Sequence, residues 1–176
     1  MRYYLGLGSN LVDPRNNLAR ARRRLAANGI KILKTSSLYR TEPVGLSGQP
    51  WFLNQAVLVE TSLSPWQLLR LAQRVESEMG RIPGPRNAPR VIDIDILLAG
   101  DTIVDTPSLT VPHPRLAERN FVLVPLAEIA PRAVHPLLKK TIQTLRGASS
   151  DRALVEKAPS ALRPDSATAK TRPRSG

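Results

Sequence analysis

The stretch VIDIDILLAG, residues 91–100, alternates isoleucine with aspartate and then continues with small and apolar residues. Alternation of this kind is typical of a half-buried β-strand, because successive side chains of a strand point to opposite faces. We therefore expect the isoleucines to enter a core while Asp93 and Asp95 emerge together on the other face, about 7 Å apart at about 3.3 Å per residue. This strand predicts both a core face and a candidate site.

Two carboxylates that close repel each other unless a cation lies between them. Magnesium ions that share phosphate oxygens with Asp93 and Asp95 would remove the repulsion and would support phosphoryl transfer. The alternative is a half-buried strand whose outer face is merely acidic, and the Asp-x-Asp pattern alone favours that alternative.

The segment just before the strand, RIPGPRNAPR at residues 81–90, is a predicted loop that carries Arg81, Arg86 and Arg90. Guanidinium groups next to a metal-binding acidic pair form the combination that a nucleotide triphosphate requires. The alternative is that these arginines simply form ion pairs with the two aspartates.

Farther out, the sequence predicts a helix that begins at the N-cap Asp13 with Pro14 and ends near Gly29. A second helix begins at a capping box, Ser64 to Gln67, and ends at Gly80. On this helix Gln73 and Glu76 lie three residues apart, so they share a face and could point together at a ligand. Strands are predicted over residues 3–7, 30–39, 53–61 and 91–98.

The order strand, helix, strand, strand, helix, strand predicts an α+β fold, a ferredoxin-like split βαβ antiparallel sheet with helices packed on one face. We expect one domain over residues 1–147. Residues 148–176 are rich in Ser, Ala, Pro, Arg and Lys, and they are predicted to form a basic, disordered tail.

Composition narrows the chemistry. The 176-residue chain is 41% hydrophobic and has no cysteine, so disulfides, zinc–thiolate sites and cysteine nucleophiles are excluded. With only two histidines, any metal should be a hard cation held by carboxylate oxygens. There is neither an apolar run of about 18 residues nor a signal-like N-terminus, which predicts a cytoplasmic protein with no membrane contact.

The formal net charge of +12 is compatible with a nucleic acid or with another polyanion such as ATP. From Ala148 onward there are six basic and three acidic residues, which leaves +9 on residues 1–147. A basic tail therefore explains only part of the charge.

Several blocks together resemble the 6-hydroxymethyl-7,8-dihydropterin pyrophosphokinases, from about Tyr4 to Pro131. They are GLGSNL, SSLYRTEPVG, FLNQAV, APRVIDIDILL and LTVPHPRLAERNFVLVPLAEIAP, in this order. The resemblance implies a transferase that moves pyrophosphate from ATP to 6-hydroxymethyl-7,8-dihydropterin in folate biosynthesis and releases AMP. It also implies two Mg²⁺ ions with ATP as co-substrate, and we expect a monomer that does not use nucleic acid as a partner.

The resemblance also implies residue roles. Catalytic positions are matched by Arg81, Arg90, Asp93 and Asp95, of which Asp93 and Asp95 match the metal ligands. ATP-binding positions are matched by Gln73, Glu76, Arg86, Arg90, Ile96, Thr110, His113 and Arg119. Pterin-binding positions are matched by Thr41, Glu42, Val44, Phe52, Asn54 and Phe121.

The implied pterin site makes physical sense, because a flat heteroaromatic ring gains contact area between two aromatic faces and Asn54 offers a donor and an acceptor. The alternative for Phe52 and Phe121 is an ordinary core position. For His113, between two prolines, the alternative is a structural turn histidine. Asn87, Ser108 and Pro114 depart from residues common in the family, which bears on ATP binding.

Two other functions were compatible with the same pattern. An RNA-binding domain also uses a split βαβ sheet and a basic surface, but it stacks bases on sheet aromatics, and aromatics make up only 4% of this chain. A metal-dependent nuclease or phosphatase would use the same aspartates without needing a pterin.

Overall fold

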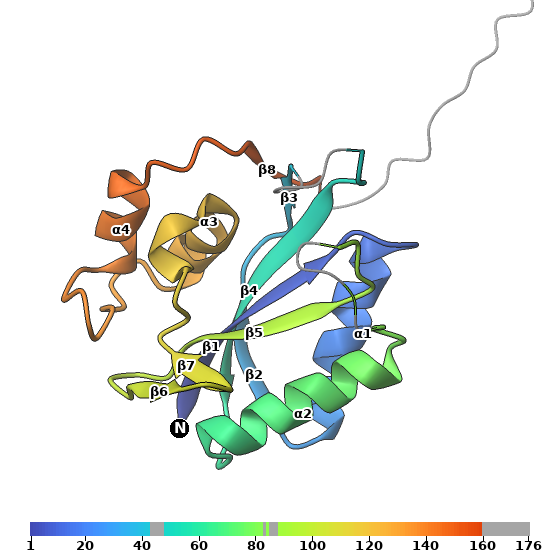
Figure 1. Cartoon of the computed structure of the whole chain (residues 1–176), viewed down its shortest axis with the longest axis horizontal. Coiled ribbons are helices and arrows are strands. Elements are labelled where there is room, and N and C mark those ends of the chain that lie inside the picture. The colour runs from blue at the N-terminus through green and yellow to red at the C-terminus, as the bar shows by residue number, and fades with distance from the viewer. Residues whose placement is uncertain (43–47, 83, 85–87, 160–176) are drawn as a thin grey trace, which may run out of the picture.

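The computed structural model describes residues 1–42, 48–82, 84 and 88–159. At its centre, an antiparallel sheet places the strands in the order β5-β1-β4-β3-β8, with β2 also paired to β4 (Figure 1). The strands of this sheet are β1 (Arg2–Ser9), β2 (Lys31–Thr35), β3 (Tyr39–Thr41), β4 (Phe52–Glu60), β5 (Asp93–Leu98) and β8 (Val155–Lys157). A separate hairpin consists of β6 (Val104–Thr106) and β7 (Leu109–Val111).

Helices α1 (Pro14–Ala27) and α2 (Pro65–Glu78) begin where the sequence predicts. The Asp13 side chain accepts a hydrogen bond from the backbone N–H of Asn16, and Ser64 and Gln67 form the reciprocal bonds of a capping box. Gly80, just after α2, has a φ of +90°, a conformation that glycine adopts without the steric cost that other residues meet.

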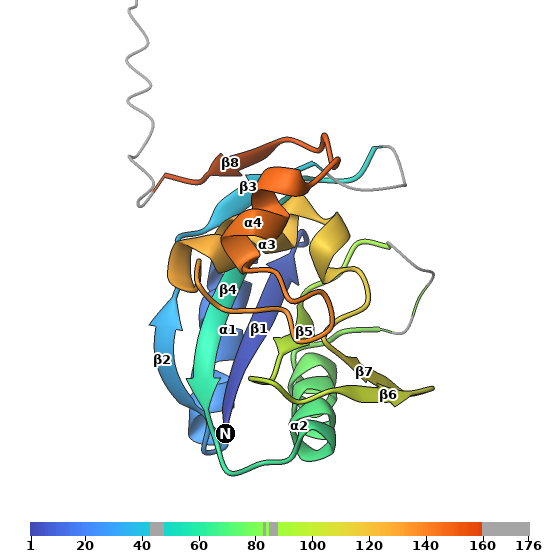
Figure 2. The ribbon, with the colours of Figure 1, turned by 90° about the vertical axis from the view of Figure 1, so that its left-hand side faces the viewer.

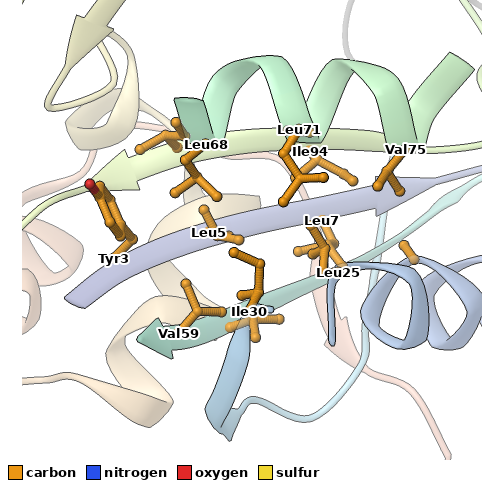
Figure 3. Close-up of a cluster of buried hydrophobic side chains, with 14 of the residues drawn as sticks. Tyr3, Leu5, Leu7, Leu25, Ile30, Val59, Leu68, Leu71, Val75 and Ile94 are labelled. Atoms are coloured by element: carbon orange, nitrogen blue, oxygen red, sulfur yellow. The ribbon is translucent and has the colours of Figure 1, made fainter. Parts of the chain in front are cut away.

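The first core lies between the sheet and these two helices. Figure 3 shows Leu5 and Leu7 of β1 among side chains of both helices, including Leu25 of α1 and Leu68 of α2. Ile94 of β5 belongs to the same cluster, as the alternation in the sequence predicts. Burying each such side chain contributes about 1.5–3 kcal/mol, so this face of the sheet fixes the register of β5 and, with it, the direction of its aspartates.

A second core lies on the opposite face. Here α3 (Asn120–Ile129) and α4 (Ile142–Ala148), preceded by the short 3₁₀ helix η1 (Leu116–Glu118), cover residues such as Ala56 and Leu97 (Figures 1 and 2). The predicted ferredoxin-like α+β fold is confirmed, with α1 and α2 on one face. The structure extends it, because the C-terminal helices cover the other face.

Several boundaries differ from the sequence prediction: β1 continues to Ser9, beyond the predicted end at residue 7, and β5 begins only at Asp93. The single strand expected over residues 30–39 is divided into β2 and β3, because Ser36 between them uses its side chain as well as its backbone to bond Ala56 of β4. The tail predicted from residue 148 begins too early, because residues 149–159 return to the domain and β8 pairs with β3. Residues 160–176 of the predicted tail lie outside the described residues. None of the described helices has the length and apolar character needed to cross a membrane.

Candidate active site

The floor of the site is a pair of glycines in the middle of the sheet. In the register of the strands, Gly6 lies opposite Asp95 of β5, and Gly8 lies between Asp93 of β5 and Asn54 of β4. These residues line a cavity of about 250 Å³ on the α3 side of the sheet. Because glycine has no side chain, the two aspartates and Asn54 face a shared space rather than a wall.

The acidic end of the cavity is held by arginines. Arg81 contacts both Glu76 and Asp93, with its Nη1 atom 2.8 Å from Asp93 Oδ1. Arg90 Nη1 lies 3.0 Å from Asp93 Oδ2. The pairing between arginines and Asp93 that the sequence left open is therefore present, and it brings guanidinium groups to the cavity wall.

Carboxylates are crowded at this end. Burial, followed by the negative charges of Asp93 and Glu76, raises the pKa of Asp95 to about 7. Burial also raises the pKa of Glu76, although Arg81 and a hydrogen bond of 2.7 Å from the backbone N–H of Ile94 act in the opposite direction. Burial and the neighbouring carboxylates therefore disfavour a charged Asp95, and a hard cation bound here would favour its ionised form.

His113 lies at the cavity wall as a neutral imidazole. Burial, followed by the positive charges of Arg119 and Arg115, lowers the pKa of His113 to about 4. Its Nδ1 atom accepts a hydrogen bond of 3.2 Å from the backbone N–H of Arg115. A neutral imidazole that accepts at Nδ1 carries its proton on Nε2, so His113 is a hydrogen-bond donor rather than a base.

The other end of the cavity is aromatic and amide-bearing. Phe52, at the start of β4, and Phe121, in the first turn of α3, both line it. The Asn54 side chain donates a hydrogen bond of 2.7 Å to Thr41 Oγ1, which fixes the orientation of the amide. The Arg119 guanidinium lies 5.2 Å from the centre of the Phe121 ring.

Asn10 ties together the two segments that flank the cavity. Its Oδ1 atom accepts a hydrogen bond of 2.8 Å from the backbone N–H of Arg90, and its backbone N–H donates to the Arg90 carbonyl. Its Nδ2 atom donates to the carbonyl of Pro50, just before β4. This buried asparagine therefore holds Arg90 beside the strand that carries Phe52.

The structure brings most of the predicted site residues into one cavity. Those that line it are Thr41, Glu42, Phe52, Asn54, Arg81, Arg90, Asp93, Asp95, His113, Arg119 and Phe121. Four others do not line it: Gln73 is exposed on α2, Glu76 lies behind Arg81, Ile96 packs in the core with α1 and α2, and Thr110 is on β7. Val44 and Arg86 lie outside the described residues.

Some lining residues were missed by the sequence reasoning. Gly6 and Gly8 are the clearest examples. Gly6 lies inside the predicted strand, where glycine indicates a close approach to something else, whereas Gly8 was expected in a turn and lies in β1 instead. Arg115 adds a fourth arginine to the cavity lining, on the His113 side next to Arg119. Nothing in its local sequence distinguishes it from an exposed arginine, so only the fold identifies it.

The chain is similar in sequence and in fold to proteins of known name. The family described as 7,8-dihydro-6-hydroxymethylpterin-pyrophosphokinase (HPPK) matches residues 4–131 of this chain. A 2-amino-4-hydroxy-6-hydroxymethyldihydropteridine pyrophosphokinase from Bacillus subtilis is 47% identical over 127 residues, which cover 72% of this chain and 76% of that protein. The protein of the same name from Methylorubrum extorquens is 48% identical over 134 residues, covering 76% of this chain and 85% of that protein.

Some relatives are much longer. The folic acid synthesis protein fol1 of Pneumocystis carinii is 44% identical over 134 residues, covering 76% of this chain but only 18% of that protein. Among solved structures, wild-type Plasmodium falciparum HPPK-DHPS with pteroate has a TM-score of 0.68 at 18% identity, covering 84% of this chain and 42% of that one. At that identity the structural likeness shows the fold alone.

Proposed function

The chain belongs to the 7,8-dihydro-6-hydroxymethylpterin-pyrophosphokinase family, and from this premise we propose that it transfers pyrophosphate from ATP to 6-hydroxymethyl-7,8-dihydropterin and releases AMP. The chain is thus a transferase of folate biosynthesis. Because it spans only 18% of the length of the fungal relative, this activity is proposed for the present chain and not for the whole of any longer protein.

The observation that carries the proposal is the division of one cavity into two chemically different ends. One end has Phe52, Phe121 and the fixed amide of Asn54, which suit a flat heteroaromatic ring with an amide-like edge. The other end has carboxylates and guanidinium groups, which suit a polyphosphate with its cations. The shared floor formed by Gly6 and Gly8 leaves space in which the two substrates would meet.

For the pterin, we assign Thr41, Glu42 and Val44 to the same end as Phe52, Asn54 and Phe121. For ATP, we assign the phosphate contacts to Arg81, Arg86, Arg90 and Arg119, and a further nucleotide contact to His113. For Gln73, Glu76, Ile96 and Thr110, which do not line the cavity, the nucleotide contact rests on the family resemblance alone. His113 supports this assignment as a neutral donor at the cavity wall. Arg81 and Arg90 would exchange part of their pairing with Asp93 for phosphate oxygens.

Asp93 and Asp95 would hold magnesium. The donor set fits, because both are oxygen ligands on one face of β5 and the half-buried Asp95 lies among like charges that a hard cation neutralises. Within residues 1–42, 48–82, 84 and 88–159, no group of three His, Cys, Asp or Glu side chains is arranged around a metal position, so phosphate oxygens and water would supply the other ligands. When bound, two such ions would offset the negative charge on the phosphates.

In the proposed reaction, the hydroxymethyl oxygen of the pterin forms a bond to the β-phosphorus of ATP. The bond from that phosphorus to the oxygen bridging the α-phosphate breaks, AMP leaves, and the hydroxyl proton passes to water. The chain contributes positioning and electrostatic stabilisation: Phe52 and Phe121 orient the acceptor, while Arg81 and Arg90 stabilise charge on the transferred group. His113 is not the base that removes the hydroxyl proton, because its pKa is low and its Nδ1 atom is occupied.

The fold argues against a sheet-surface RNA reader. In such a module one face of the sheet is open, so that bases stack on it. Here α1 and α2 pack on one face and α3 and α4 on the other, over the described residues.

We also propose that the chain works as a monomer in the cytoplasm, where ATP is available. Gel filtration would test the oligomeric state, and cell fractionation would test the location.

The proposal is tested by mixing the purified protein with ATP, magnesium and 6-hydroxymethyl-7,8-dihydropterin and following nucleotides by phosphorus NMR. AMP should appear only when the pterin is present. ADP, or hydrolysis without pterin, would instead indicate a phosphatase or nuclease chemistry on the same aspartates.

A single substitution tests the role of the acidic pair. Asp95→Asn should lower turnover about 100-fold or more, the scale of losing one preorganised charge-stabilising group. The matched control is Asp101→Asn, because Asp101 is an exposed aspartate in the turn after β5. Wild-type turnover in Asp95→Asn, with the fold unchanged by circular dichroism, would contradict the metal-binding assignment.

A further inference from the structure

The pterin end of the cavity combines residues from β3 and α3, two elements that bond each other directly through Tyr39 and Glu128, near the end of α3 away from Phe121. Thr41 and Glu42 come from the end of β3, whereas Phe121 comes from the first turn of α3. The first residues of α3 also lack a local cap: the N-cap residue Arg119 makes no side-chain capping bond, and the first turn has no acidic residue. The unsatisfied N–H groups of this turn must therefore find a partner elsewhere.

The partner is Asp151, 31 residues farther along the chain. Its Oδ2 atom accepts a hydrogen bond of 2.7 Å from the backbone N–H of Asn120, the first residue of α3. Its backbone carbonyl accepts one of 2.8 Å from Asn120 Nδ2. A carboxylate at the N-terminus of a helix is stabilised by the helix dipole as well as by the hydrogen bond.

The same segment continues to β3. We call residues 149–159 the strap, and Figure 2 shows it running from α4 past α3 to the edge of the sheet. Asp151 Oδ1 accepts from the N–H of Ala153, which turns the chain toward Leu154. The N–H of Leu154 donates to Glu42 Oε2, and the N–H of Glu42 donates to the Leu154 carbonyl, each at 3.4 Å. In the register of β3 and β8, Thr41 then lies opposite Val155.

The far end of the strap returns to the same two elements. The N–H of Ala158 donates a hydrogen bond of 2.8 Å to the carbonyl of Leu38. Lys157 Nζ lies 3.5 Å from Oε1 of Glu128, a residue near the end of α3 that also accepts from Ser37 and Tyr39. The strap thus fixes β3 and α3 relative to one another at both ends.

We propose that Asp151 is a positioning residue for the pterin, because one carboxylate oxygen holds the turn of α3 that carries Phe121 and the other shapes the strap that holds Glu42. The inference rests on the proposed function. Asp151 does not line the cavity, so it acts through Phe121 and Glu42 rather than by touching substrate. The acidic end depends on β5 and on the segment before it, so the loss of Asp151 should affect the pterin far more than ATP.

The test uses the full chain with Asp151→Ala. We expect KM for the pterin to rise about 5- to 20-fold, less than for the loss of a charge-assisted hydrogen bond to the substrate itself, because Asp151 acts through Phe121 and Glu42. KM for ATP and kcat at saturating pterin should change less than about twofold. Asp151→Asn should be intermediate, because its amide oxygen still accepts from Asn120. The control is Glu156→Ala, which removes an exposed carboxylate from the same strap.

Hydrogen exchange provides a readout that does not depend on activity. Amides of the first turn of α3 should exchange faster in Asp151→Ala than in Glu156→Ala. An unchanged pterin KM in Asp151→Ala, or equal rises in both KM values, would overturn the positioning role. A wild-type protein that makes no AMP with pterin would instead contradict the proposed function, and the exchange result would still decide whether Asp151 holds α3.

Discussion

Gly8 lies at the centre of the cavity floor, next to the Asn54 side chain. The absence of a side chain at Gly8 leaves room for the Asn54 amide, whereas the backbone conformation of Gly8 does not require glycine. A Cβ atom added at Gly8 would lie 2.9 Å from Asn54 Oδ1, closer than side chains tolerate. The backbone of Gly8 has no positive φ, so alanine can adopt it. The cost of a larger residue there is therefore a displaced Asn54 amide.

Gly8→Ala should consequently weaken pterin binding about 10-fold or more while leaving the fold intact, since a misplaced hydrogen-bonding group in a binding site costs more than about 1.4 kcal/mol. Titration with the pterin, followed by its fluorescence, measures this. Gly147→Ala is the control, because no atom lies within 4 Å of a Cβ added at Gly147. Equal affinities in the two variants would show that the floor tolerates a methyl group.

Among the individual site residues, those that belong to a regular sequence pattern could be predicted. Asp93 and Asp95 follow from strand alternation, and they do face the cavity. The glycine inside the predicted first strand, Gly6, indicated a close approach, but the partners of Gly6 and Gly8 depend on which strands pair beside them and could not be predicted. Arg115 belongs to the same class, since its charge matters only after η1 places it beside His113.

The start of helix α2 is determined by its own residues rather than by contacts from distant parts of the chain. Ser64 Oγ accepts from the N–H of Gln67, and Gln67 Oε1 accepts from the N–H of Ser64 at 2.8 Å, so both backbone donors are satisfied within the first turn. The same helix carries Glu76, which bonds the backbone of β5 next to the aspartates. The stability of this helix and the geometry of the acidic end are therefore linked.

Ser64→Ala should lower the free energy of unfolding by about 1 kcal/mol, the usual effect of removing an N-cap side chain. Urea denaturation followed by circular dichroism measures the change. Ser77→Ala, at an exposed position near the end of α2, should alter stability by less than about 0.5 kcal/mol. If both variants were equally stable, the capping box would contribute nothing.

Strand β8, in contrast to α2, forms only because of contacts with residues that are distant in sequence. Its three residues have no hydrophobic period, so the sequence placed them in a tail. What makes them a strand is the edge of β3 and the bonds of Asp151 and Glu42, all distant in sequence. Similarly, β2 and β3 separate only because Ser36 bonds Ala56 on β4.

The whole molecule is a sheet with helices packed on both faces. The packing of α1 and α2 could be predicted from the sequence, whereas the face on which α3 and α4 pack could not. The first strands and helices follow the split βαβ order, whereas α3 and α4 come after the pattern is complete. Their apolar residues indicated burial without indicating a face. The site lies on the side that they cover, which explains why the pterin end depends on α3 and the acidic end on β5.

Stability of the whole molecule should depend on pH through His135, a buried residue between α3 and α4 that accepts a hydrogen bond from the N–H of Leu138. Burial lowers the pKa of His135 below its ordinary value of 6.5. Above that value the imidazole is neutral in both states. Below it, the unfolded chain takes up a proton that the folded chain resists, so stability present at pH 7.5 is lost on acidification.

His135→Gln should therefore lose less stability than the wild type between pH 7.5 and pH 5, by at most about 2 kcal/mol, because one pKa unit corresponds to about 1.4 kcal/mol. Urea denaturation at both pH values measures the difference. The stability difference between wild type and Ser77→Ala should stay constant with pH. A constant difference for His135→Gln as well would show that His135 titrates alike in the folded and unfolded chain.

Finally, β8 ends the sheet at β3, and a sheet that ends in an open strand invites self-association. An exposed strand edge offers free N–H and C=O groups that can pair with another copy of the same chain. Here the edge is closed by a strand of only three residues, two of them the charged Glu156 and Lys157. A chain shortened before β8 would leave β3 uncovered, and it should form aggregates under conditions in which a chain ending at Pro159 remains dispersed.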